Sequence, residues 1–156
     1  MAMAMTLKQF LAQQHVDYEL LAHEYTGSSM ETAEAAHVPG EQLAKPVILE
    51  DETGYLMAVI PATHWLEIGV LSHQLERRLG LATESEISTL FDDCDIGAIP
   101  PLGQAWGMDV IIDDSLQKCD DIYFEAGDHT ELVHMRGKDF EKLLAEKAHG
   151  TFSHHR

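Results

Sequence analysis

The sequence is poor in cysteine and has no long hydrophobic run. Its two cysteines, Cys94 and Cys119, are too few and too far apart for a disulfide framework, so we expect a reducing compartment. The longest uninterrupted apolar stretch, from Leu56 to Ile60, is far below the ~20 residues that cross a bilayer. The N-terminus lacks the basic start and apolar run of a secretory signal. These absences predict a cytoplasmic protein with no membrane partner.

Positive charge is also scarce. The chain has 27 acidic residues against 10 Lys and Arg, which gives a formal net charge of -17. Proteins that bind nucleic acid usually present a basic face that neutralises phosphates. The composition therefore argues against long, tight contacts with RNA and against DNA as a partner.

The rest of the composition is that of an ordinary globular domain. Hydrophobic residues make up 45% and charged residues 24%, and no internal repeat is present. We expect a single domain over residues 1–148 and a flexible tail over residues 149–156.

Hydrophobic periodicity and turn residues predict the order of helices and strands. Thr6, Ser28 and Thr83 are expected helix caps, the last two with a Glu three residues later. Irregularly interspersed strands and helices favour an α+β domain with a mixed sheet. The expected helices cover residues 6–15, 28–36, 72–79, 83–91 and 138–147, and the expected strands cover residues 18–23, 44–49, 55–60, 108–112, 121–125 and 129–135.

Lys45 is the first candidate for chemistry. It is the only Lys or Arg between Lys8 and Arg77, and it opens an apolar strand. Pro46 restricts Lys45 to extended geometry and is itself tolerated at the start of a strand. Such a lysine could hold an anion or polarise a carbonyl. The alternative is a lysine that only extends its stem beside acidic neighbours such as Glu41 or Glu50.

The second candidate is a stiff loop with two glycines and two prolines. Glycine lets the backbone approach a ligand closely, and the backbone N–H groups could stabilise an oxyanion. A purely structural turn is the alternative. The loop reads Gly97, Ala98, Ile99, Pro100, Pro101, Leu102, Gly103.

Other kinds of catalytic site find little support. His129 and His134 lie five apart in an expected strand and would face opposite sides, and His23-Glu24 lacks the second histidine of a zinc-protease helix. We therefore expect no metal and no other cofactor. Neither cysteine stands beside an evident base, so no covalent nucleophile is predicted.

Three segments together resemble the YbaK and prolyl-tRNA-synthetase-associated editing domains. They are the strand opening at Lys45, the Gly-x-x-Pro-Pro-x-Gly loop at 97–103, and Phe124-Glu125-Ala126-Gly127 before a strand and a final helix. The resemblance extends from residue 6 to about residue 147, and residues 26–37 resemble the family's pocket-forming loop and helix. Pro46 departs from the pattern, since many relatives have Thr or Asn there.

The resemblance implies a mixed, mostly antiparallel, barrel-like sheet surrounded by helices. It also implies hydrolysis, without a metal, of the ester that joins a wrong amino acid to a tRNA. Lys45 would contact the ligand near the terminal adenosine and the ester, and the 97–103 loop would hold the substrate. Water, or a hydroxyl or thiol of the substrate, would be the nucleophile. Further pocket walls are predicted at Ser28, Ser29, Met30 and His64.

We therefore predict an aminoacyl-tRNA deacylase that edits in trans. The partner is the acceptor end of a tRNA that carries a small non-cognate amino acid such as Ala or Cys, and a homodimer is left open. The acidity supports an alternative, a ligand-binding or regulatory module that has lost RNA binding. A hydrolase of other small esters is a third hypothesis.

Overall fold

The computed structural model describes residues 3–25 and 28–156. Five α-helices are present in these residues: α1 (Met5–Gln14), α2 (Ser29–Ala36), α3 (Ile68–Leu75), α4 (Glu84–Leu90) and α5 (Gly137–Leu143). Three short 3-10 helices are η1 (Gly40–Gln42), η2 (Gly103–Trp106) and η3 (Asp114–Lys118). The strands are β1 (Glu19–Ala22), β2 (Ala44–Asp51), β3 (Gly54–Pro61), β4 (His64–Leu66), β5 (Gly80–Leu81), β6 (Asp109–Asp113), β7 (Asp121–Glu125), β8 (Glu131–Arg136), β9 (Ala148–Gly150) and β10 (Ser153–His155).

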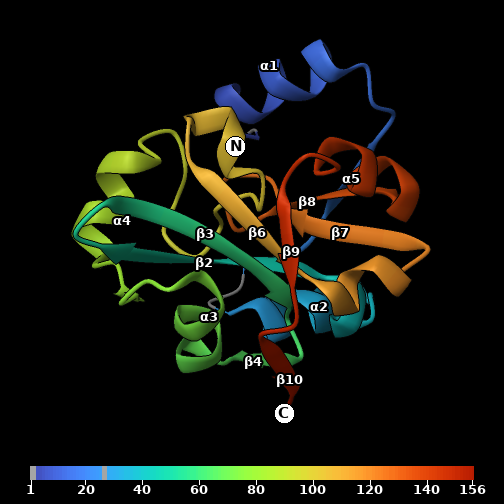
Figure 1. The fold of residues 1–156 in the computed structure, drawn as a ribbon. Coiled ribbons are helices and arrows are strands. Elements are labelled where there is room, and N and C mark those ends of the chain that lie inside the picture. Colours follow the sequence, from blue (N-terminus) through green and yellow to red (C-terminus); the bar gives the residue numbers. More distant parts are fainter. Residues whose placement is uncertain (1–2, 26–27) are drawn as a thin grey trace.

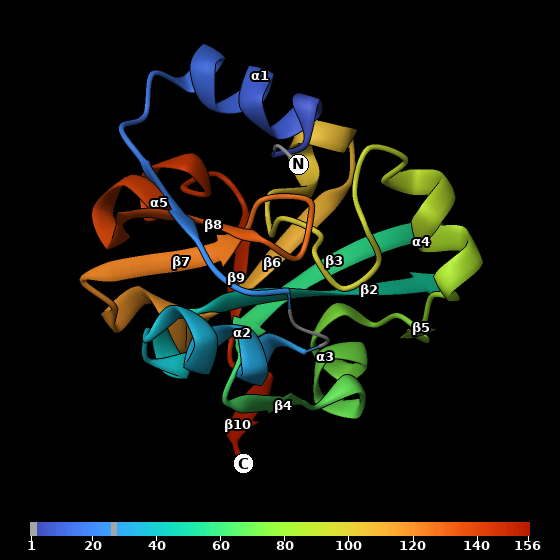
Figure 2. The same ribbon diagram turned by 180° about the vertical axis from the view of Figure 1, so that it is seen from behind.

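The strands form three separate sheets. The largest has the order β5-β2-β3-β6-β9, in which β3, β6 and β9 run parallel and the other pairs are antiparallel. The second has the antiparallel order β1-β8-β7, and the third is the antiparallel pair β10-β4. Figures 1 and 2 show α1 at one end of the molecule and β4 with β10 at the opposite end.

Alternation along β2 and β3 places a hydrophobic core on each face of the five-stranded sheet. Ile48, Met57 and Val59 face the larger core, which also contains side chains from α1, α5 and the β1-β8-β7 sheet. Leu49 and Ala58 face the smaller core, to which α3 contributes. The sheet is therefore covered on both sides, as its nearly continuous apolar strands require.

The structure confirms the α+β class and a mixed, mostly antiparallel arrangement, but it corrects the expectation of a barrel. The described strands belong to three sheets, none of which closes on itself. The predicted hairpin is present, with Lys45 opposite Ile60. The capping box of α4 is formed by Thr83 and Glu86, and Ser28 caps α2.

Several boundaries differ from the prediction. The helix expected at 72–79 lies at Ile68–Leu75, where it buries Leu71. Thr6 is not a helix cap, because α1 begins at Met5 with Ala4 in the cap position. The N–H of Thr6 donates to Asp93 Oδ2 at 2.9 Å, in a loop that is distant in the sequence. His129 lies in the turn before β8 rather than within the strand.

The C-terminal segment also differs from the predicted flexible tail. Residues 148–150 form β9 beside β6, and residues 153–155 form β10 beside β4. Phe152 between them is fully buried in the smaller core, and its N–H donates to Asp113 Oδ1 at 2.9 Å. A buried aromatic side chain explains why this polar, histidine-rich segment is held against the domain.

Candidate active site

A cavity of about 270 Å³ lies along the edge of β2. β2 pairs with β5 only at Leu49 and Glu50, so its first half borders the cavity instead of another strand. Pro46 fits this place, because an edge position does not require a backbone N–H. The cavity is lined by Lys45, Pro46, Val47, Ile48, Leu81, Ala82, Ile87, Ile96, Gly97 and Ile99.

Lys45 is the only charged residue in this lining. Its side chain is half-buried, and among the residues that the structure describes no carboxylate lies within ion-pair distance of its ammonium group. Burial lowers the pKa of Lys45, and the positive charge of Arg156 lowers it further. An unpaired cation in an apolar cavity is suited to binding an electronegative oxygen of a ligand.

The 97–103 loop contributes Gly97 and Ile99 to the same cavity. Gly97 has φ +86°, a conformation that favours glycine. No oxygen in the described part of the chain accepts a hydrogen bond from the N–H of Gly97 or of Ile99. Two residues that line the cavity with Lys45 therefore carry backbone donors that no oxygen of the described residues accepts from.

The other residues of the 97–103 loop are buried and do not line the cavity, among them Ala98, Pro100 and Pro101. Gly103 begins η2 and packs against Met57 and Val110, where an added Cβ would lie 3.2–3.3 Å from their side chains. The second half of the loop thus anchors it in the larger core.

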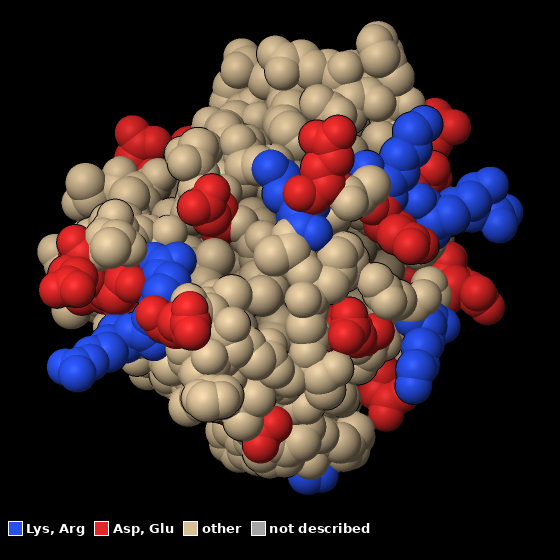
Figure 3. Space-filling model, in the orientation of Figure 1, with Lys and Arg blue, Asp and Glu red and all other residues tan. Residues whose placement is uncertain are grey.

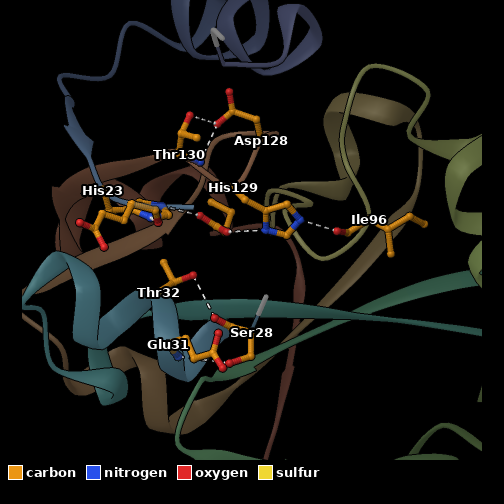
Figure 4. A network of polar contacts seen from close by, with 10 residues as sticks. His23, Ser28, Glu31, Thr32, Ile96, Asp128, His129 and Thr130 are labelled. Atoms are coloured by element: carbon orange, nitrogen blue, oxygen red, sulfur yellow. Dashed lines mark hydrogen bonds and ion pairs between the residues drawn. The ribbon is translucent and has the colours of Figure 1, made fainter. Parts of the chain in front are cut away.

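A buried polar network lies directly behind Gly97. His129 Nε2 is 2.7 Å from the carbonyl oxygen of Ile96, and its Nδ1 is 3.7 Å from Glu125 Oε2 (Figure 4). The other carboxyl oxygen of Glu125 is 3.2 Å from Nε2 of His23, whose Nδ1 is 2.7 Å from the carbonyl oxygen of Glu24. The network joins the ends of β1 and β7 to the backbone just before the 97–103 loop.

Hydrogen-bond chemistry fixes where protons lie in this network. Carbonyl oxygens only accept, so Nε2 of His129 and Nδ1 of His23 must carry hydrogens. The nitrogen atoms that face Glu125 are therefore bare when the rings are neutral, and a protonated Glu125 can donate to His23. Burial raises the pKa of Glu125 to about 8, and the nearby charge of Asp128 contributes to this rise.

Three other predicted wall residues lie outside this cavity lining, namely Ser28, Met30 and His64. Ser28 is the cap of α2, where its Oγ accepts from the Glu31 N–H at 3.2 Å. Met30 is partly exposed on α2 with its sulfur beside Gly40. His64 lies on β4, with Nδ1 2.8 Å from Ser153 Oγ. The side chain of Ser29, like all of Thr26 and Gly27, lies outside the described residues.

The thiols are poor nucleophile candidates. Burial and neighbouring aspartates raise the pKa of Cys94 far above its usual range, and burial also raises that of Cys119. No group of three or more potential ligands in the described residues is arranged to hold a metal ion. No helix in that part of the chain is long and apolar enough to span a membrane.

Sequence reasoning missed the apolar half of the cavity and the buried network. Leu81, Ala82, Ile87 and Ile96 are ordinary hydrophobic residues until the fold brings them to the edge of β2. The Glu125-Ala126-Gly127 motif was a signal for the network, but the sequence could not show that Glu125 lies between two histidines.

Comparison with known proteins identifies a family. The model of the aminoacyl-tRNA editing domain matches residues 23–143, which is more than half of the chain. A search of curated proteins gives no match.

Solved structures show the same fold at low sequence identity. A hypothetical protein, APE2540, has a TM-score of 0.84 at 18% identity, with 96% of this chain and 99% of that chain covered. A proposed trans-editing enzyme for prolyl-tRNA synthetase has a TM-score of 0.81 at 18% identity, with 98% and 99% covered. A proposed signal transduction protein from Marinobacter aquaeolei VT8 has a TM-score of 0.78 at 19% identity, and the similarity covers 95% of this chain but 30% of that one.

Proposed function

Because the chain belongs to the aminoacyl-tRNA editing domain family, we propose that it hydrolyses the ester between a transfer RNA and a wrongly attached amino acid. The observation that carries the proposal is a single cavity lined by Lys45, Gly97 and Ile99, where the backbone N–H groups of Gly97 and Ile99 have no acceptor among the described residues. An aminoacyl ester is already activated, so such a site needs no covalent nucleophile. The family match gives no support to a regulatory module without RNA binding.

The reaction follows from where these donors lie. A water oxygen attacks the carbonyl carbon of the ester and forms a tetrahedral oxyanion. The N–H groups of Gly97 and Ile99 donate hydrogen bonds to that oxyanion, a contribution of roughly 2.7–4 kcal/mol per donor in known cases. The bond between the carbonyl carbon and the ribose oxygen then breaks, and a proton from the attacking water passes to the ribose oxygen.

Lys45 positions the ester in this scheme. Its ammonium group would donate to oxygens of the terminal ribose and the ester, and this fixes the carbonyl beside the loop. Since its surroundings lower the pKa of Lys45, a negatively charged or strongly electronegative ligand would be favoured there over water alone.

The proposed substrate carries a small amino acid such as Ala or Cys. A cavity of about 270 Å³ with mostly apolar walls must hold the amino acid together with part of the terminal nucleotide, so little room remains for a large side chain. The fold shared with a proposed trans-editing enzyme for prolyl-tRNA synthetase supports action in trans. The place of action would be the cytoplasm.

The test is a deacylation panel at low salt. The protein is mixed with transfer RNAs charged with Ala, Cys, Ser or Pro, and loss of the ester is followed over time. Lys45→Ala should abolish hydrolysis, whereas Lys142→Ala, at an exposed position on α5, should leave it unchanged. Failure of the wild-type protein on every substrate, or full activity of Lys45→Ala, would contradict the proposal.

A further inference from the structure

A second feature, outside the Lys45 cavity, combines an exposed aromatic ring with a cation. Trp65 on β4 is 54% exposed, and the guanidinium carbon of Arg156, directly after β10, lies 4.1 Å from the centre of its ring. We name these two residues the Trp65–Arg156 platform. Aromatic rings and arginines side by side are the elements with which proteins bind single-stranded nucleic acid.

The backbone holds the platform in place. Trp65 pairs with His154 across the β4–β10 ladder, and the N–H of Arg156 donates to the carbonyl of Thr63 at 3.0 Å. The ladder begins at His64, three residues after Pro61, the last residue of β3. The platform is thus continuous with the β2–β3 hairpin that carries Lys45.

The charge of Arg156 is felt at the active site. Lys45 pairs with Ile60 near the end of β3, and the N–H of Arg156 donates to the carbonyl of Thr63, three residues after Ile60. The positive charge of Arg156 also lowers the pKa of Lys45. In the described residues, neither side chain has a carboxylate within ion-pair distance. Two unpaired cations held near each other are costly without an anion, and a phosphate group would remove that cost.

The surface around the Trp65–Arg156 platform carries acidic residues, and this limits the length of RNA that could bind there. The chain carries a net charge of -17, and Figure 3 shows that Lys and Arg side chains on the visible face are interspersed with acidic ones. Glu41 and Glu67 flank the platform through contacts to His155 at 3.4 Å and to His154 at 3.5 Å. A polyanion would therefore be tolerated over a short length, which suits a few nucleotides and not a long duplex.

We propose that the Trp65–Arg156 platform binds the single-stranded 3′ end of the RNA next to the terminal nucleotide in the Lys45 cavity. One base would stack on Trp65, and Arg156 would contact a phosphate between that base and the terminal adenosine. This inference rests on the proposed function. It would explain how a strongly acidic protein retains an RNA substrate through a short contact.

The experiment compares two substrates that differ in length. One is the aminoacyl-tRNA that the wild-type protein hydrolyses best, and the other is the matching aminoacyl-adenosine, which has no phosphate. Trp65→Ala combined with Arg156→Gln should raise KM for the tRNA about tenfold with little change in kcat, because stacking and one phosphate contact are lost. Hydrolysis of the aminoacyl-adenosine should be unchanged.

Three further variants separate a specific contact from a general effect. Trp65→Phe should restore most of the tRNA affinity, because an aromatic face is kept. Arg156→Gln alone should lower the salt dependence of binding by about one phosphate contact. The control Arg136→Gln removes an equal charge at the end of β8, away from β10 (Figure 1), and should leave both substrates unaffected.

The outcomes also distinguish this inference from the proposed function. An unchanged KM for the tRNA in the double variant, with normal hydrolysis, would overturn the platform and leave the activity intact. If the wild-type protein hydrolysed none of the substrates, binding of an RNA hairpin that has a CCA end and carries no amino acid would be measured by fluorescence anisotropy at low salt. Equal binding by wild-type and double variant, or no binding by either, would then overturn the platform as well.

Discussion

Replacement of Glu125 by glutamine tests the buried network behind the active-site loop. Glu125 lies between His23 and His129, and burial raises its pKa from 4.5 to about 8. Glutamine has nearly the same shape and keeps a donor for His23, but it does not titrate. The difference between wild type and variant therefore isolates the proton that the network holds.

The expected effect follows from proton linkage. A raised pKa in the folded state means that, between pH 4.5 and about 8, the folded protein binds a proton that the unfolded chain has released. The stabilising effect of this proton is present at low pH and is lost as pH rises through the folded pKa. At about 1.4 kcal/mol per pH unit, the stability of the wild type should fall relative to Glu125→Gln by about 3–4 kcal/mol from pH 5.5 to pH 8.5.

Glu125→Gln removes one titrating carboxyl group and leaves every other histidine and carboxyl group of the chain in place. The pH dependence of the difference between the two proteins therefore reports on the Glu125 site.

The assay is urea unfolding of both proteins at half-unit steps from pH 5.5 to pH 8.5. Wild type and variant should have similar dependences of the unfolding free energy on urea concentration. As the pH rises, the unfolding free energy of the wild type should decrease steadily relative to that of the variant. Two parallel curves, with a constant difference across this range, would refute the reasoning that the network holds an extra proton.

Three other substitutions test separate parts of the fold and site. Gly97→Ala should reduce hydrolysis more than tenfold in steady-state kinetics and lower the stability by about 1–2 kcal/mol in thermal unfolding. The reason is that φ at this position is +86° and that the new Cβ would lie 3.1 Å from Cε1 of His129. Phe152→Ala should cost about 3–5 kcal/mol in urea unfolding because the ring is fully buried, whereas a flexible tail would give almost no effect. Thr83→Ala should cost about 1 kcal/mol by the same measurement through loss of the α4 capping box, and an unchanged stability would show that the cap contributes nothing.

Local signals in the sequence were sufficient to predict most helices and strands. They were also sufficient to select Lys45 and the 97–103 loop as candidate site residues. Alternating apolar residues and the Asp51–Gly54 turn predict the β2–β3 hairpin, and Thr83 with Glu86 predicts the start of α4. The isolation of Lys45 and the composition of the 97–103 loop single out both as candidates, because rarity and backbone stiffness are visible in one dimension. Their roles in catalysis stay predictions.

Only the tertiary structure decided what lies next to what. Lys45 and Gly97 are 52 positions apart, and the partial pairing of β2 with β5 leaves the edge at which they meet. Glu125 becomes a buried group between two histidines, and the segment after residue 147 becomes two strands, because Phe152 finds a place in the smaller core. Periodicity and capping act over a few residues, whereas burial and charge proximity depend on segments far apart in the chain, and a single sequence contains no direct signal for those contacts.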